Sequence, residues 1–190
     1  VSPTISRFNL HEIVDFTKYF TDRGVPVWYC LYWYDYPAEN QLFEIGKKTD
    51  EFGITDGKAM AMVCDKLIEM KRERQGVFIT DKTLMALKQL FLNGQRTWSC
   101  QALKGFFMVD HLGRVAGCHC NEPVASVFEL PEVWDSPKFE SLRKKYHECN
   151  RCAYMCYIFY SLHTNVSGNL EIIRDQWRNA KSLFTKTRKT

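Results

Sequence analysis

The sequence predicts an α/β protein in two parts: strand–helix units of a parallel sheet, then a smaller α+β part with a β-hairpin. The first observation is a nearly continuous apolar and aromatic run, Val25 to Tyr34, which is typical of a strand buried on both faces of a parallel sheet. The second is the helical spacing of apolar residues on both sides of this run. The third is a cysteine-rich second half that contains two short strand patterns around a glycine turn, in residues 105–118.

Residues 3–34 predict a strand–helix–strand crossover. A short strand ends at Ile5, and Asn9 with Glu12 three residues later has the pattern of a capping box at a helix start. Gly24 then stands where a C-terminal cap belongs. A single crossover cannot close a sheet, so we expect further strands outside this chain or on a partner.

Four more helices are expected after a less regular, acidic segment at 35–57. Residues 58–74 have an apolar stripe, and residues 80–92 follow with Thr80 as the cap. A short helix opens at Ser136, with proline next to it, and leads to Cys149. Residues 168–184 form the last helix by the same spacing rule.

Composition excludes several classes of protein. Apolar residues make up 45% and charged residues 25%, which is ordinary for a folded soluble chain. The formal charge of +4 is partly due to the C-terminal tail, so we expect no nucleic-acid partner. No apolar run approaches a membrane span and no signal peptide opens the chain, so we expect a reducing cytoplasm and no membrane. The first residues, Val1-Ser2-Pro3, read as the middle of a fold.

Six of the eight cysteines form the pattern C-x17-C-x-C followed, after 28 residues, by C-x2-C-x3-C. Four thiolates suit zinc or an iron–sulfur cluster, and spacing alone does not separate the two. Cys30 and Cys64 lie in apolar patterns and are interpreted as packed thiols. Histidines next to the motif rank below the thiols as ligands: they are His111, His119 and His147.

The wider pattern resembles the auxiliary-cluster region, called a twitch or SPASM domain, of radical S-adenosylmethionine enzymes. The resemblance rests on C-x17-C with D-x-x-G before its second cysteine, on E-V-W-D-S-P-x-F-x-x-L-R at 132–143, and on C-x2-C-x3-C. The tract before it resembles the fifth and sixth strand units of that family's partial (β/α)6 barrel. The implied domains are 1–57, the C-terminal units of the TIM-like barrel; 58–95, linking helices; 96–160, the cluster-binding domain; and 161–190, a C-terminal helix and basic tail.

The resemblance implies one auxiliary [4Fe–4S] cluster that relays electrons or engages substrate. Its implied ligands are Cys100, Cys118, Cys149 and Cys152, with Cys120 and Cys156 as alternates. The family's C-x3-C-x2-C motif, which holds the cluster that cleaves S-adenosylmethionine into a 5′-deoxyadenosyl radical, is absent. We therefore expect the second cluster on a missing N-terminal half, and this chain alone to be inactive.

Further implied partners are a peptide or small-molecule substrate and an electron donor such as flavodoxin or ferredoxin. Near the expected barrel mouth, Ser6 and Asn9 would contact S-adenosylmethionine or substrate, and so would Tyr34 to Tyr36. For Asn9, a helix-cap role is an equal alternative. Two other readings stay open: a structural zinc-binding interaction module, and a non-catalytic relative that keeps the cluster. The sequence does not identify the substrate.

Overall fold

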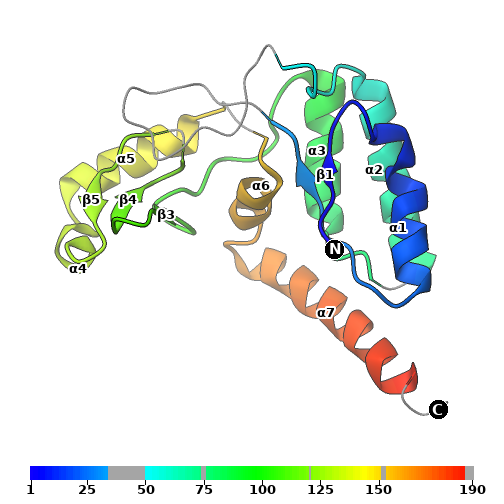
Figure 1. Cartoon of the computed structure of the whole chain (residues 1–190). Helices are drawn as coiled ribbons and strands as arrows, with labels where there is room; N and C mark the ends of the chain where they lie inside the picture. The colour runs from blue at the N-terminus through cyan, green and yellow to red at the C-terminus, as the bar shows by residue number, and fades with distance from the viewer. Residues whose placement is uncertain (34–49, 74–75, 120, 151–152, 187–190) are drawn as a thin grey trace.

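The computed structural model describes residues 1–33, 50–73, 76–119, 121–150 and 153–186. The expected mixed α/β class is confirmed, with small sheets among a larger share of helix (Figure 1). The elements are β1 (Thr4–Ile5), η1 (Leu10–Glu12), α1 (Ile13–Asp22), β2 (Cys30–Leu31), α2 (Gly57–Glu73), α3 (Asp81–Asn93), β3 (Met108–Val109), β4 (Arg114–Ala116), β5 (Ala125–Ser126), α4 (Leu130–Val133), α5 (Pro137–Glu148), α6 (Met155–Leu162) and α7 (Val166–Lys186).

The first part contains the expected parallel crossover. Strands β1 and β2 pair in parallel, with Ile5 opposite Leu31, and α1 joins them. A third parallel segment, missed by the sequence analysis, lies on the other side of β2. There Val27 donates its N–H to Gly76 O at 2.7 Å, and its carbonyl accepts from Phe78 N–H at 2.9 Å. Helix α2 is therefore a crossover between neighbouring parallel segments as well as a link to the second part.

One face of this small sheet forms the core of the first part. Val27, Tyr29 and Leu31 are buried in one apolar cluster with residues of α1, α2 and α3. The Tyr29 hydroxyl hydrogen-bonds Thr17 Oγ1 on α1 at 2.8 Å. The alternate residues point the other way, and Cys30 is exposed. The expectation that this strand is buried on both faces is therefore wrong for its described residues.

The expected helices at 58–74, 80–92 and 137–148 form within a residue or two of their predicted bounds. Thr80 accepts a hydrogen bond from Thr83 N–H at 3.3 Å, and Gly94 ends α3 with φ +67°. Ser136 caps α5 by accepting from Phe139 N–H at 3.4 Å. The first helix differs, because Leu10–Glu12 is a 3₁₀ turn and the side chain of Asn9 does not cap it.

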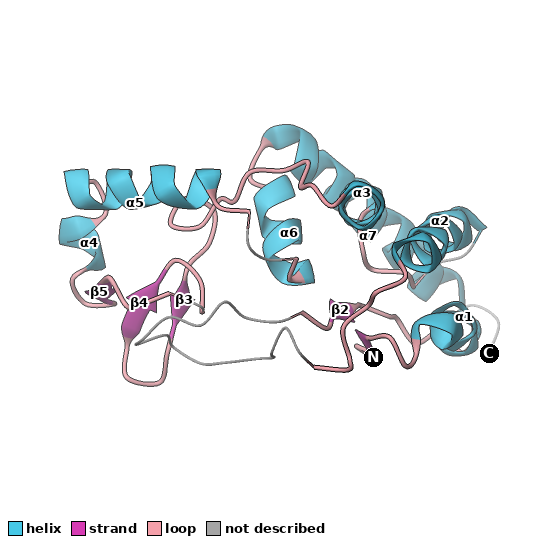
Figure 2. Ribbon diagram, turned by 90° about the horizontal axis from the view of Figure 1, so that it is seen from above, coloured by secondary structure: helices cyan, strands magenta, loops and turns pink. Residues whose placement is uncertain are grey.

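The second part is built on an antiparallel sheet. The predicted hairpin is β3 and β4, with Val109 opposite Val115, and β5 adds a third strand beside β4. The turn is closed by Asp110, whose carboxylate accepts from the backbone N–H groups of Leu112 and Arg114. Helix α5 covers this sheet through a second apolar cluster, and Figure 2 shows α4 and α5 beside the three strands.

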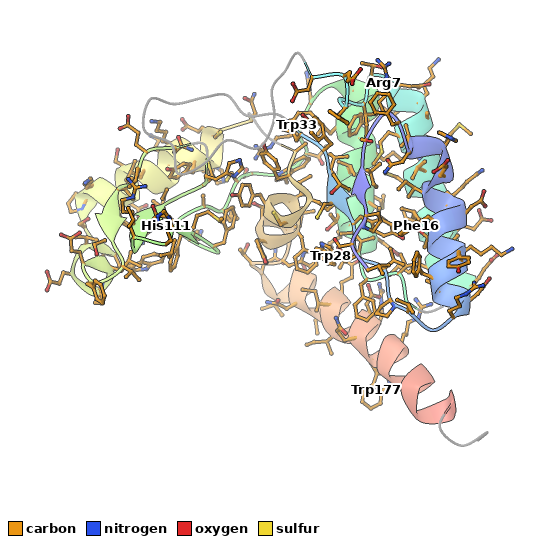
Figure 3. All side chains as sticks on the ribbon, in the orientation of Figure 1. Arg7, Phe16, Trp28, Trp33, His111 and Trp177 are labelled. Atoms are coloured by element: carbon orange, nitrogen blue, oxygen red, sulfur yellow. The ribbon has the colours of Figure 1, made fainter. Side chains whose placement is uncertain are left out.

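Helix α6 lies between the two parts, and α7 runs below them in the view of Figure 1, past the end of α2 and the start of α3. Helix α7 presents its charged side to the protein. Lys71 on α2 is buried and forms ion pairs with Asp175 of α7 and, at 3.1 Å, with Asp81 of α3. The predicted apolar stripe faces outward: Ile173 is 63% exposed and Trp177 65%, as Figure 3 shows for Trp177.

Glu171, one turn before Asp175, strengthens this polar contact. Burial alone raises its pKa, but the imidazole of His163 at 3.8 Å, the Lys82 N–H at 3.3 Å and the charge of Lys71 hold the pKa below its ordinary value. Charged pairs therefore hold α7 in place. Among the described residues, no helix is both long and apolar enough to cross a bilayer.

Candidate metal centre

Three cysteines from separate segments meet in the second part. Cys100 follows α3, Cys118 follows the last strand of the hairpin, and Cys149 comes directly after α5. Cys100 is buried, and the other two are half-buried. Burial raises the pKa of the Cys100 thiol, and the nearby thiols of Cys118 and Cys149 raise it further. Since such an effect requires proximity, the fold brings together thiols that lie up to 49 residues apart in sequence.

Tyr146 fills the space next to these thiols. Its side chain is buried, and burial together with the charges of the three thiols raises the pKa of its hydroxyl above the ordinary value. The ring lies directly on the backbone of Gly117: a Cβ added there would lie 2.3 Å from two ring carbons. Because only glycine allows this approach, Tyr146 can hold the end of β4, and with it Cys118, close to α5.

The sulfur of Cys118 has a dedicated hydrogen-bond donor. Asn121 Nδ2 donates to Cys118 Sγ at 2.6 Å, and the Asn121 backbone N–H donates to the Cys118 carbonyl at 3.2 Å. A donor aimed at sulfur stabilises the thiolate and tunes the potential of any redox centre bound to it. The sequence analysis missed this contact, although an asparagine three residues after a candidate ligand cysteine is a visible signal.

Arg143, the last residue of the E-V-W-D-S-P-x-F-x-x-L-R motif, fastens the segments that carry the cysteines. Its Nε donates to Leu103 O at 2.8 Å and its Nη2 to Trp134 O at 2.6 Å. The guanidinium also lies 4.7 Å from the centre of the Trp134 ring. Leu103 has φ +58°, a left-handed conformation that a leucine rarely adopts, and the bond from Arg143 helps to hold it. The turn after Cys100 is thus tied to the helix that ends at Cys149.

The histidines do not lie in ligand positions. His119 is buried, with Nδ1 2.7 Å from the Tyr157 hydroxyl and its ring edge-on to Tyr154 at 4.7 Å, so its imidazole is engaged with α6. His111 is exposed at the tip of the hairpin (Figure 3), and His147 is exposed on α5. Their lower rank as ligands agrees with these positions.

The remaining cysteines have different surroundings. Cys120 and Cys152 lie outside the described residues. Cys156 lies on α6, where the thiol that acts on it electrostatically is Cys30. Cys64 is fully buried, as the packed-thiol interpretation predicts, but that interpretation is wrong for Cys30, because the pleat of β2 turns it to the exposed face.

The described thiols are neighbours and do not form a closed ligand set. Within the described ranges, no three His, Cys, Asp or Glu side chains are arranged so that they could hold a metal ion. A four-thiolate site would need Cys152 or Cys120, which the described ranges exclude. The convergence of Cys100, Cys118 and Cys149 is therefore the structural observation on which a metal proposal depends.

Ser6 and Asn9 form a local hydrogen-bonded turn at the carboxyl end of β1. Asn9 Oδ1 accepts from Ser6 N–H at 2.8 Å, and Asn9 Nδ2 donates to Thr4 O at 2.9 Å. The helix-cap role considered for Asn9 is wrong, because its side chain turns back to the strand. A contact with S-adenosylmethionine stays a prediction, and residues 34–36 lie outside the described ranges.

Comparison with known proteins adds no relative. No family model, no curated protein and no solved structure matches this chain. The functional argument therefore depends on the residues and geometry described above.

Proposed function

We propose that this chain is the C-terminal part of a radical S-adenosylmethionine enzyme, and that it binds an auxiliary [4Fe–4S] cluster through Cys100, Cys118, Cys149 and Cys152. The observation that supports the proposal is that Cys100 and Cys118 lie in one cluster with Tyr146, and that the Cys149 thiol is near enough to act on Tyr146 electrostatically. Thiolates are the ligands that such clusters prefer. The barrel assignment and the larger enzyme come from the sequence resemblance.

The chemistry of the site fits a cluster better than a set of packed thiols. The sulfur of Cys118 accepts a hydrogen bond from Asn121, which favours its ligand form, the thiolate. The packed thiol of Cys64, by contrast, lies among apolar side chains, where burial raises its pKa to about 12. The second ligand pair would come from the turn after α5, where Cys152 follows Cys149 by three residues.

A bound cluster would supply a site for one-electron transfer. The residues of the chain would bind and shield it. Tyr146, Leu103 and Phe139 would shield it, since these buried side chains belong to the same apolar cluster as Cys100. Beyond it, Phe106 stacks on Tyr157 of α6, with ring centres 5.0 Å apart. These side chains exclude water, and exclusion of water together with sulfur hydrogen bonds sets the potential.

The first part supports a barrel segment. Three consecutive segments pair in parallel, and α1 and α2 lie on one face of them, as crossover helices do in a (β/α) barrel. The opposite face, which would line the interior, carries Trp28 and Cys30, and part of it is covered by Phe159 of α6. Strands from an N-terminal half would complete the barrel beside β1.

Anaerobic reconstitution of the full chain with iron and sulfide tests cluster binding. We expect about four iron and four sulfide per chain, a brown colour, and loss of the visible band in air. Alanine at Cys100, Cys118 or Cys149 should remove most of the iron. Cys30→Ala is the matched control, because Cys30 is exposed and belongs to the first part, and it should retain the full iron content.

Two results would overturn the cluster assignment. One is a colourless protein that binds a single zinc ion and takes up no iron, which would establish the structural zinc module. The other is unchanged iron in all three alanine variants. The larger assignment has a separate test in the coding sequence upstream of Val1: an open reading frame without C-x3-C-x2-C would remove catalysis and leave a non-catalytic relative.

A further inference from the structure

The exposed face of β2 carries a thiol that is accessible to reagents. The backbone N–H groups of Trp28 and Cys30 donate to Val1 O and Pro3 O, each at 3.0 Å, so this stretch is extended and its side chains alternate between two faces. Tyr29 and Leu31 enter the core, whereas Cys30 is exposed. Ser2 precedes the neighbouring strand β1 by two residues, and its Oγ lies 3.5 Å from Cys30 Sγ.

Helix α6 lies against this same face. The rings of Trp28 and Phe159 meet edge to face, with centres 5.1 Å apart. Cys156 precedes Phe159 by three residues and so shares its side of the helix. Three helical residues advance by about 4.5 Å, and the two residues from Trp28 to Cys30 advance by about 6.6 Å. Cys156 therefore lies on the side of α6 that carries the aromatic contact with Trp28, and both advances are short enough for Cys156 and Cys30 to be neighbours.

Independent observations agree with this register. Helix α6 contacts β2, and the charge on the Cys30 thiol acts on that of Cys156. Both cysteines are exposed, in contrast to the fully buried Cys64. Neither belongs to the group of three thiols in the second part. A disulfide requires Cα atoms about 4.4–6.8 Å apart, so closure requires Cys30 and Cys156 to come within this range across the contact between β2 and α6.

The geometry points to Cys30 and Cys156 as a redox-active dithiol that closes into a disulfide between β2 and α6 by exchange with a glutathione-type disulfide. The thiolate of Cys30 attacks one sulfur of the oxidant, forms a mixed disulfide and releases one glutathione thiolate. The thiolate of Cys156 then attacks the Cys30 sulfur and releases the second glutathione. The two protein thiols lose two electrons and two protons, and one oxidised glutathione becomes two reduced molecules.

The order of attack follows from the surroundings. Cys30 has the Ser2 hydroxyl within reach of its sulfur and is exposed at the sheet. The pKa of Cys156 lies above its ordinary value, because neighbouring atoms partly desolvate its thiol and the Cys30 thiol is nearby, although the residue keeps a solvent-exposed surface. Closure should therefore accelerate as the pH rises and more of Cys156 becomes thiolate. The bond would fix α6 on the sheet, and with it the link between the two parts of the chain.

The test is disulfide mapping of the full chain after incubation with mixtures of reduced and oxidised glutathione. After alkylation of free thiols and proteolysis, mass spectrometry should find the Cys30 peptide joined to the Cys156 peptide. The linked fraction should fall as reduced glutathione increases. The Cys64 peptide is the internal control and should remain unlinked and be alkylated only after unfolding.

Single serine variants sharpen the test. In Cys156→Ser, Cys30 should accumulate as a mixed disulfide with glutathione, because the resolving thiol is missing, while the iron content after reconstitution stays at the wild-type level. Mixed disulfides at both cysteines of the wild type without a cross-link would overturn the proposal, as would a link from Cys156 to Cys152. Loss of iron in Cys156→Ser would also overturn it and identify Cys156 as a cluster ligand.

Discussion

Replacement of Arg143 by alanine should destabilise the second part of the chain. The guanidinium donates to two backbone carbonyls, those of Leu103 and Trp134, at 2.8 and 2.6 Å, and its side chain is 15% exposed. A hydrogen bond from a charged group contributes about 1.5–3 kcal/mol. Loss of both should lower the free energy of unfolding by about 3 kcal/mol or more. The pair with Glu140 adds little, because that carboxylate is 76% exposed.

Urea denaturation of Arg143→Ala, followed by tryptophan fluorescence, measures this loss. Trp134 lies under the guanidinium, so its emission reports on the region that the change perturbs. Arg143→Lys should lose about half as much, because an ammonium cannot reach both carbonyls in the same geometry. Lys144→Ala is the matched control, since Lys144 is the exposed neighbour on α5, and should stay within about 0.5 kcal/mol of the wild type.

The reasoning would be refuted if Arg143→Ala unfolded within about 0.5 kcal/mol of the wild type. It would also be refuted if Lys144→Ala lost as much stability as Arg143→Ala, because the effect would then belong to helix α5 in general. A loss confined to Arg143 would explain the motif that ends in this residue. The motif then serves to fasten the turn after Cys100 to the helix before Cys149.

Three further predictions concern α7 and Gly117. Lys71→Met should cost about 3–5 kcal/mol in urea titration, because Asp175 would lose its buried cation, and adding Asp175→Leu should recover most of it. The pKa of Glu171 is lowered from its ordinary value of 4.5 in the folded protein. The ionised carboxylate therefore stabilises the fold above that pH, and this contribution is lost as the pH falls through the folded pKa. Glu171→Gln should flatten the decline of the free energy of unfolding below about pH 4.5. The same dependence of unfolding free energy on acid pH in Glu171→Gln and in the wild type would contradict this. Gly117→Ala should lower the Tm measured by circular dichroism, because the added Cβ would collide with the Tyr146 ring. Adding Tyr146→Leu to this variant should restore part of the lost Tm. A Gly117→Ala variant with the Tm of the wild type would show that the ring moves freely.

Local chemistry explains why several elements could be predicted from sequence. Thr80 and Ser136 cap their helices by bonds to residues three positions away, so the information lies within one turn. Asn9 has the same pattern, but the N–H of Ser6 and the carbonyl of Thr4 compete for its side chain. Those partners belong to the strand before it, and a helix-start rule does not consider them.

Tertiary pairing explains what was missed. The residues from Val77 to Thr80 are all strand formers, but the run is short, and its place beside β2 is set by the two hydrogen bonds at Val27. The outward stripe of α7 is a second case. Its spacing identifies the helix, but the side that faces the protein is decided by Lys71, which lies about a hundred residues earlier in the chain.

The cysteines show the same division between spacing and environment. The spacing C-x2-C-x3-C leaves Cys156 as an alternate ligand beside Cys149 and Cys152. In the structure α6 begins at Met155, and an aromatic contact joins this helix to the stretch that contains β2. Cys156 is therefore turned toward Cys30, while Cys149 stays with Cys100 and Cys118. Sequence spacing indicates which thiols are close in sequence, but it does not indicate which of them are close in the folded protein. The start of a helix decides which of them share a site, so Cys156 and Cys149 are expected to differ in two measurable properties, iron retention and disulfide partner.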